Sequence, residues 1–293
     1  PNIAFTFQSE PITVVPAGID NLQGDYDALQ EFYTAMDGPN WDNNTGWTDM
    51  TPETMGDAFG VTVYPAGHEF EGRVKELSLS GYPIGRTDRG NVMDGAPVGN
   101  NLKGDYIPDS FANLKKMTHL RLKGNDITAP INNWIQDLES AEWISLSAAK
   151  EYGGQDEINL YDLVRYNHPS KNGDSYNKFT GPMVDDLSML SNLELLEISH
   201  SNLTGQLPQK MPSSIRGIFL QNNQMTGSLP EWSNAVNVTH MYIMNLHDSG
   251  EYTGTIPKAW NNMSKMAWIT TKGNNLDGPF PKFDDWTDLR FFG

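Results

Sequence analysis

The sequence predicts an α/β solenoid in which short strands from successive coils form one parallel β-sheet. Three observations predict it: a motif that recurs along most of the chain, an apolar alternation inside each copy, and a Gly and a Pro that follow at fixed positions. The composition agrees, because 27 Gly and 18 Pro in 293 residues suit many short segments joined by turns. One such unit cannot bury its own apolar face, so stacked units must share a core.

The chain divides into three parts in sequence order. Residues 1–18 alternate weakly between apolar and polar side chains, which predicts an N-terminal strand or a linker. Residues 19–73 predict an N-terminal cap that contains a helix. Residues 74–293 hold the repeats.

The cap helix is predicted from apolar side chains at helical spacing between Tyr26 and Met36. Asp25 is the expected N-cap, because a short polar side chain there can accept a hydrogen bond from the first turn. Gly38 is the expected end of the helix, because Gly adopts the left-handed conformation that often follows a last turn.

Each repeat predicts a strand, a turn and a return segment. In "IRGIFLQNNQMTGSLP", Ile218 and Leu220 should point into the core while Phe219 between them points out. Asn223 can hydrogen-bond the backbone of its own turn, and Gly227 allows a bend that a Cβ would oppose. Similar copies recur from "VKELSLSGY" to a last partial copy, "LRFF".

The spacing LxxLxLxxNxLTGxIP resembles the plant-type subclass of leucine-rich repeats. The resemblance covers roughly residues 74–293 in about eight repeats, and it implies a horseshoe with a parallel concave β-sheet and a helical N-terminal cap. It also implies an extracellular role, because such repeats are typical of receptor ectodomains and bacterial surface proteins. The chain has no Cys, whereas the cap of the plant proteins usually carries cysteines. This departure and the long insertions favour a bacterial cell-surface member.

Three insertions interrupt the repeats, at residues 81–99, 148–176 and 245–252. Each leaves its repeat after the strand and returns before the Gly turn, so all three should project from one edge of the solenoid. Loops on a rigid scaffold often carry function. Neutral variation of a tolerant edge is the alternative.

The outward side chains of the strands give the candidate ligand-binding surface. Phe219, His240, Tyr242, Met244 and Trp268 fall on consecutive strands and should form an exposed aromatic cluster, the kind of surface from which binding hot spots are made. A cover formed by an insertion or by a missing carboxy-terminal piece is the alternative.

Two further residues, Arg121 and Trp143, extend this surface toward the amino terminus. Arg121 also belongs to a basic spot with His119 and Lys123 on a chain of net charge −17. These basic residues are consistent with the binding of an acidic partner or with a face that is only solvated. At the other end, the last copy should place Asp288 beside Trp268.

No catalytic, cofactor or metal motif stands out in the sequence. The six His lack metal-binding spacing, and no nucleophile elbow, phosphate-binding loop or dinucleotide fingerprint occurs. The paired aspartates at 185–186 and 284–285 suit turns better than glycoside hydrolysis. We therefore expect no catalytic residue, no cofactor and no metal.

The acidic charge argues against a nucleic-acid partner, and no apolar stretch is long enough to span a membrane. The sequence thus favours a non-enzymatic recognition module that binds a protein or peptide through its concave face and insertion-bearing edge, with a glycan as the alternative ligand. A structural or adhesive spacer is the second hypothesis, and a polysaccharide-degrading enzyme the third. We expect an extracellular or cell-surface location, with a lipid anchor upstream of Pro1 as one means of attachment. The oligomeric state and the ligand's identity stay open.

Overall fold

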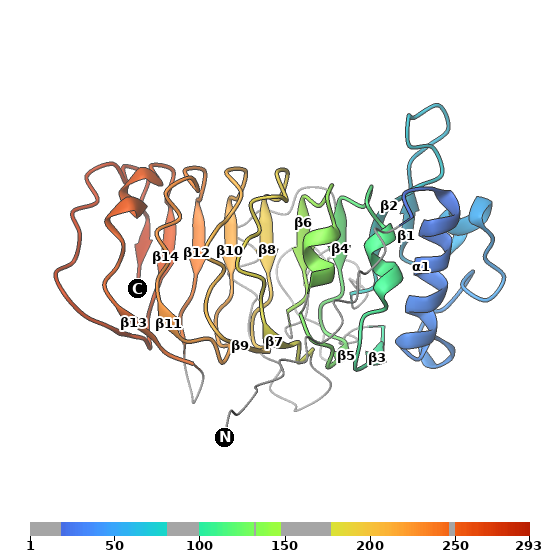
Figure 1. Ribbon diagram of the computed structural model, residues 1–293, viewed down its shortest axis with the longest axis horizontal. Helices are drawn as coiled ribbons and strands as arrows, with labels where there is room; N and C mark the ends of the chain where they lie inside the picture. Colours follow the sequence, from blue (N-terminus) through green and yellow to red (C-terminus); the bar gives the residue numbers. More distant parts are fainter. Residues whose placement is uncertain (1–18, 81–99, 132, 148–176, 246–249) are drawn as a thin grey trace, which may run out of the picture.

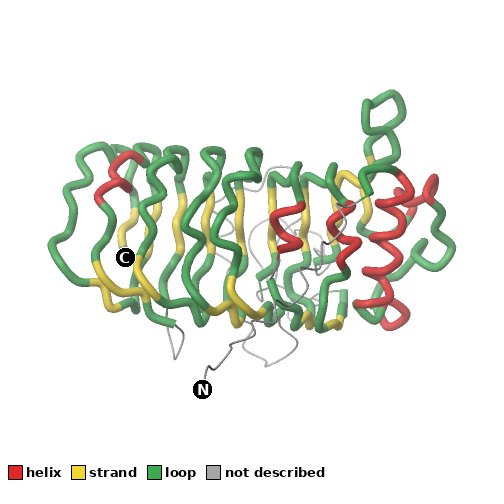
Figure 2. Tube along the Cα trace, in the orientation of Figure 1, coloured by secondary structure: helices red, strands yellow, loops and turns green. Residues whose placement is uncertain are grey.

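The computed structural model describes residues 19–80, 100–131, 133–147, 177–245 and 250–293. Coils of similar outline stack along one long axis, and the helix α1 stands at the amino-terminal end of the stack (Figure 1). Strands recur at corresponding positions in successive coils, whereas helices are few and short (Figure 2). This is the predicted α/β solenoid.

Three of the segments expected from the sequence are not among the described residues. They are the amino-terminal strand or linker at 1–18 and the insertions at 81–99 and 148–176.

A nine-stranded sheet runs the length of the solenoid. Eight of its strands are parallel, one from each predicted repeat, while β1 pairs antiparallel with β2 at the cap end. In spatial order the strands are β1 (Val61–Val63), β2 (Val74–Ser78), β4 (His119–Arg121), β6 (Trp143–Ser145), β8 (Leu195–Glu197), β10 (Gly217–Phe219), β12 (His240–Tyr242), β14 (Trp268–Thr270) and β16 (Phe291–Phe292).

Shorter parallel ladders form where the chain passes the Gly turn. They pair β3 (Lys103–Gly104) with β5 (Asp126–Ile127), β7 (Thr180–Pro182) with β9 (Asn202–Thr204), and β13 (Tyr252–Gly254) with both β11 (Gly227–Ser228) and β15 (Asn275–Leu276). Single turns of 3-10 helix follow in three coils, as η3 (Asp109–Asn113), η4 (Asn133–Asp137) and η5 (Lys258–Asn262).

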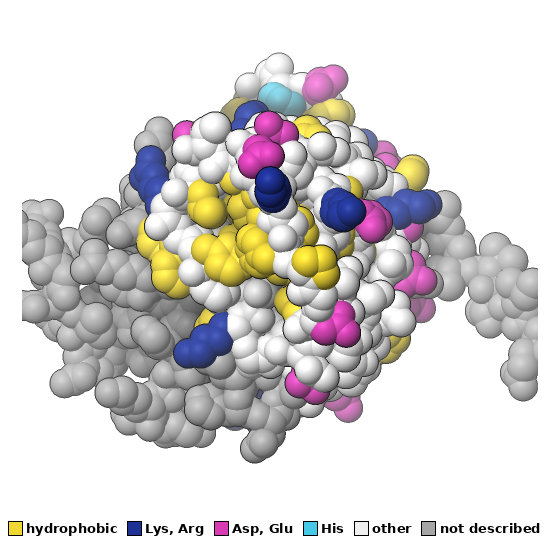
Figure 3. Space-filling model, turned by 90° about the vertical axis from the view of Figure 1, so that its left-hand side faces the viewer, with side chains coloured by type: hydrophobic (Ala, Val, Ile, Leu, Met, Phe, Trp, Pro, Cys, Tyr) yellow, Lys and Arg dark blue, Asp and Glu magenta, His cyan; other side chains and the backbone are white. Residues whose placement is uncertain are grey.

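From β2 to β14, the apolar residue at the centre of each parallel strand points into one continuous core. Register pairing aligns these residues from coil to coil, and each is buried: Leu77, Leu120, Ile144, Leu196, Ile218, Met241 and Ile269. Phe292, the counterpart on β16, is 41% exposed at the end of the stack, where apolar side chains gather (Figure 3). The row confirms that the repeats share a single interior, as the spacing predicts.

The repeat asparagines link neighbouring coils. The Asn223 amide nitrogen donates to the Ile198 and Leu220 carbonyls at 2.8 and 3.0 Å, and its amide oxygen accepts from the Leu203 N–H at 3.2 Å. Asn125, Asn177 and Asn274 make equivalent bonds. A buried turn would otherwise leave these backbone groups unpaired, at a cost of about 1–3 kcal/mol each.

The cap helix α1 spans Leu22–Ala35, and it begins earlier than the sequence predicts. Asn21 is the N-cap, since its side chain accepts from the Gly24 N–H at 2.8 Å. Asp25 therefore lies inside the helix, where it is fully buried. The expected N-cap was wrong because an earlier Asn competes for the same role.

The end of this helix also differs from the prediction. Asp37, not Gly38, adopts the left-handed conformation, with φ of 59°. Gly38 instead begins the short helix η1 (Gly38–Asn40), and a Cβ added to it would lie 2.2 Å from the Tyr33 ring. Gly is required there for close packing. A further 3-10 helix, η2 (Pro52–Asp57), precedes the first strand of the sheet.

The third insertion is shorter than the predicted 245–252. Asn245 is buried, and the Gly250 N–H donates to the Asn223 carbonyl at 2.7 Å. Tyr252 is also buried, and it opens β13. Of the predicted insertion, residues 246–249 alone lie outside the described residues.

The register of the last strand corrects another expectation. Phe291, not Asp288, pairs with Trp268, and Phe292 pairs with Ile269. Leu289 therefore takes the position of Met266, ahead of the strand. Several apolar residues follow one another in "LRFF", so spacing alone did not fix which of them starts the strand.

Candidate ligand-binding surface

Two positions of each parallel strand flank the buried central residue and face away from the core. The first row includes His119, Trp143, Leu195, Gly217, His240 and Trp268 on neighbouring strands. The second row includes Arg121, Ser145, Glu197, Phe219, Tyr242 and Thr270. Six of the seven candidate residues fall in these rows, whereas Met244 follows the end of β12, and their role in ligand binding stays a prediction.

A second apolar cluster lies on this outward face, apart from the main core. Leu195, Phe219 and Tyr242 form its buried part, and Trp143 and Trp268 pack against it from both sides. We call these five residues the outer aromatic cluster. The Phe219 and Tyr242 rings stack with centroids 5.2 Å apart and an interplanar angle of 14°.

The exposure of the candidate residues differs from the prediction. Phe219 has no exposed surface and Tyr242 is 8% exposed, so the predicted open cluster was wrong at these two positions. The spacing of strands in a sheet, about 4.8 Å, suits aromatic rings stacked face to face, so neighbouring rings cover each other.

The other candidates stay partly open to solvent. Arg121, Trp143, His240, Met244 and Trp268 are half-buried. Trp268 stacks on Phe291 of the last strand at 5.1 Å. The Met244 sulfur accepts from the Thr270 hydroxyl at 3.7 Å.

A buried ion pair lies next to the outer aromatic cluster. The Lys123 ammonium is 2.7 Å from Glu197 Oε1, and the Ser145 hydroxyl donates to Glu197 Oε2 at 2.6 Å. All three side chains are buried. Lys123 therefore does not belong to a solvated basic face. Glu197 was missed because a single Glu between the inward residues Leu196 and Ile198 is expected to face solvent.

Arg121 and His119, the other two residues of the predicted basic spot, lie beside Trp143, and Arg121 also lies near Glu76 of β2. The Arg121 guanidinium lies 5.8 Å from the Trp143 ring and 3.5 Å from Glu76 Oε2. The His119 ring lies 5.4 Å from that of Trp143. Burial, with Arg121 nearby, lowers the pKa of His119, so this imidazole is neutral at pH 7.

His240 has a similar environment two strands before the end of the sheet. Its Nδ1 lies 2.9 Å from the Thr239 hydroxyl. Burial first, then the charges of Arg216 and Arg290, lower its pKa to about 4. The two histidines therefore add no charge to this surface at neutral pH, and the buried Lys123–Glu197 pair lies in its middle, beside Phe219.

No group of three or more His, Cys, Asp or Glu in the described ranges could hold a metal ion. Within those ranges, no helix has the length and apolar character needed to cross a bilayer.

Curated relatives of the chain are plant receptor-like proteins. Receptor-like protein 35 of Arabidopsis thaliana is 26% identical over 225 residues, which cover 71% of this chain and 23% of the relative. Receptor-like protein 18 of the same plant is 30% identical over 175 residues, which cover 59% and 20%. The chain thus spans about a quarter or less of the length of these relatives, and no protein-family model matches it. None of these relatives supports the expected bacterial origin.

Solved structures agree with the fold. The ectodomain of the Arabidopsis receptor kinase HAESA, in complex with an IDA peptide hormone, superimposes with a TM-score of 0.61 at 20% identity, over 93% of this chain and 37% of that one. The PEPR1–AtPEP1 complex gives a TM-score of 0.51 at 20% identity, over 88% and 32%. The chain therefore has the leucine-rich-repeat fold, built from repeats of the plant type.

Proposed function

We propose that the chain is a non-enzymatic recognition module that binds an extended peptide or protein segment across the outward face of its large sheet. The outer aromatic cluster carries this proposal. The centre of the cluster is buried, so the part of it that a ligand can reach is the half-buried surface of Trp143 and Trp268. Half-buried tryptophans flank the cluster, and Trp is among the residues that most often supply binding energy at interfaces.

The ligand would lie along the first row, from Trp143 to Trp268. Trp143, His240, Met244 and Trp268 would contact it directly. Phe219 and Tyr242 would hold the tryptophans in position from within the cluster. Arg121, fixed against Trp143, would face an acidic or carbonyl group of the ligand.

The solved complexes support the choice of ligand class. HAESA has been solved in complex with the IDA peptide hormone and also together with the co-receptor SERK1, and PEPR1 has been solved in complex with AtPEP1. This chain covers about a third of those proteins, so their ligands indicate a class and no particular peptide. A glycan ligand is a weaker alternative, because the two outward rows of the described strands hold no Asn or Gln, and of their two carboxylates, Glu76 and Glu197, the second is buried.

An extracellular or cell-surface location belongs to the same proposal, because the curated relatives are receptor-like proteins. A lipid anchor and a bacterial source stay predictions from the sequence.

A structural spacer is the second candidate function. The burial of Phe219 and of the Lys123–Glu197 pair favours it, because covered side chains on this face are unavailable to a ligand. If the chain is a spacer, this face binds no ligand, and substitution of both flanking tryptophans should change no binding.

A peptide-display selection separates the two functions. The purified chain is the bait, and selected peptides are tested on the Trp143→Ala/Trp268→Ala variant. The matched control is Met189→Ala/Val236→Ala, which removes exposed apolar side chains from turns. We expect binding to fall at least about tenfold in the first variant and to persist in the control. Equal binding by both variants, or no enrichment over an unrelated bait, contradicts the proposal.

A further inference from the structure

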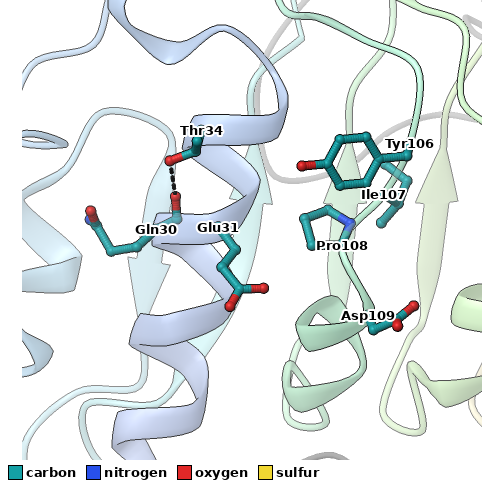
Figure 4. Close-up of a pocket in the computed structure, with 7 residues that line it drawn as sticks. All are labelled: Gln30, Glu31, Thr34, Tyr106, Ile107, Pro108 and Asp109. Carbon is teal, nitrogen blue, oxygen red and sulfur yellow. Dashed lines mark hydrogen bonds between the residues drawn. The ribbon is translucent and has the colours of Figure 1, made fainter. Parts of the chain in front are cut away.

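A cavity of about 500 Å³ opens between the cap helix and the chain that leads into η3. Its walls come from two elements: α1 contributes Gln30, Glu31 and Thr34, and the segment before and at the start of η3 contributes residues 106–109. Figure 4 shows the Tyr106 ring and the Glu31 side chain on opposite walls of this gap. The volume falls in the range of small-ligand sites.

The walls are held in place by contacts outside the cavity. The Phe32 and Phe111 rings pack with centroids 5.1 Å apart, deep between the two elements. The Ser110 hydroxyl donates to Glu31 Oε2 at 2.6 Å. The gap is therefore a fixed feature of the junction between the cap and the first coil.

The charged groups around this cavity are both acceptors. Glu31 and Asp109 supply two carboxylates, and no Lys or Arg is among the lining residues. Within the part of the chain that the structure describes, Glu31 Oε1 and both Asp109 oxygens have no hydrogen-bond partner. The Thr34 hydroxyl already donates to the Gln30 carbonyl at 3.0 Å.

An aromatic face completes the site. Tyr106 is 53% exposed, which is unusual for a large side chain with apolar neighbours such as the buried Ile107. A planar cation can stack on such a ring while it donates to carboxylates. Two acidic groups beside an open aromatic face form the arrangement that recognises a guanidinium group.

We propose that this cavity binds the guanidinium group of an arginine side chain on a partner protein or peptide. Guanidinium has five N–H donors and no acceptor, which matches a site rich in acceptors. A sugar presents both donors and acceptors, but the Gln30 amide and the Thr34 hydroxyl already donate within the protein, which leaves the Tyr106 hydroxyl as the side-chain donor among the lining residues. The net charge of −17 favours the approach of a cation.

This site is independent of the outer aromatic cluster. It is built from the cap helix and the return segment of the first coil, and it shares no residue with the strands of the large sheet. Loss of binding at one site is therefore measurable without loss at the other.

The test is an NMR titration of the 15N-labelled chain with N-acetyl-arginine amide. We expect shifts of the amide signals at 30–34 and 106–109 and a dissociation constant in the millimolar range. N-acetyl-citrulline amide, which has the same shape without the charge, should bind at least about tenfold more weakly. Spermidine, a cation that is not planar, should also bind more weakly.

Substitutions of residues that line the cavity give the second part of the test. Asp109→Asn, whose carboxylate contacts no other described side chain, should raise the dissociation constant several-fold without unfolding the chain. Glu31→Gln and Tyr106→Leu should do the same, while Asp277→Asn, which removes an exposed carboxylate from the last coils, should not. Equal binding of citrulline amide, tighter binding of spermidine, no shifts at the named amides, or equal losses in the control would overturn the proposal.

Discussion

The Arg73 guanidinium and the Asp25 carboxylate form a buried, two-bond ion pair between the cap helix and the first parallel strand. Arg73 Nε and Nη2 lie 2.9 and 2.8 Å from the two Asp25 oxygens. The Val74 N–H donates to the same carboxylate at 2.8 Å. Burial raises the pKa of Asp25, and these three donors oppose that rise.

Removal of this carboxylate should be among the most damaging single changes in the cap. Asp25→Ala leaves the Arg73 charge buried without its main partner, which should cost about 3–5 kcal/mol of unfolding free energy. Asp20 contacts the same guanidinium from a more exposed position, at 2.8 Å. Asp20→Ala should therefore cost less than about 1 kcal/mol. Urea unfolding followed by circular dichroism measures both, and similar losses would contradict the assigned role.

The repeat asparagines make a second prediction. Asn223→Ala removes three hydrogen bonds to buried backbone groups of two coils, so we expect a loss of about 2–4 kcal/mol. Asn275→Ala, at an exposed position, is the matched control and should change stability by less than about 0.5 kcal/mol. Thermal unfolding compares the two, and a stable Asn223→Ala variant would show that water replaces the lost bonds.

A third prediction concerns the buried pair on the outward face. Glu197→Gln should destabilise the chain by about 3 kcal/mol or more, because the Lys123 charge stays buried at 2.7 Å from a neutral amide. The double variant Lys123→Met/Glu197→Gln removes that charge and should recover most of the loss. A double-mutant cycle by chemical unfolding gives the coupling directly. Additive losses would mean that the two charges do not depend on each other.

The pH dependence of stability gives a fourth prediction. The folded-state pKa of His240, about 4, lies below the unfolded value of 6.5, so the unfolded chain binds the extra proton between these values. Stability should therefore rise with pH across this window and fall as pH drops from 6.5 toward 4. Allowing for partial exposure, the effect of this one side chain should be about 1 kcal/mol.

His240→Leu isolates that contribution, because other titrating groups are present in both proteins. The stability difference between the variant and the wild type should shift in favour of the variant as pH falls from 7 to 5. A difference that is constant with pH would show that His240 stays neutral in both states or is charged in both.

Much of the fold could be predicted because each structural position, such as the buried centre of a strand, recurs in every copy of the repeat. Leu120, Ile144 and Leu196 occupy one row, and an error in one copy is corrected by its neighbours. The last strand has no later copy to correct it, and its register was misjudged at Phe291. Asp25 was likewise misread as a cap residue because its partner, Arg73, is 48 residues away.

For the candidate surface, the sequence predicted which strand positions face outward but not how exposed their side chains are, and it did not single out Leu195 as part of the cluster. Spacing along each strand decides which face a side chain takes, so Phe219, Tyr242 and Trp268 were grouped correctly. Spacing does not decide how tightly neighbouring rings cover each other, and Phe219 proved buried. The cavity beside Tyr106 left no signal in the sequence, because its walls come from segments about 75 residues apart.

The most direct test of the account is the affinity of a display-selected peptide for the wild type and for Trp268→Ala, measured by isothermal titration calorimetry. We predict a rise of at least about tenfold in the dissociation constant, or about 1.4 kcal/mol, with a midpoint of thermal unfolding close to that of the wild type. An unchanged dissociation constant would contradict recognition through the outer aromatic cluster.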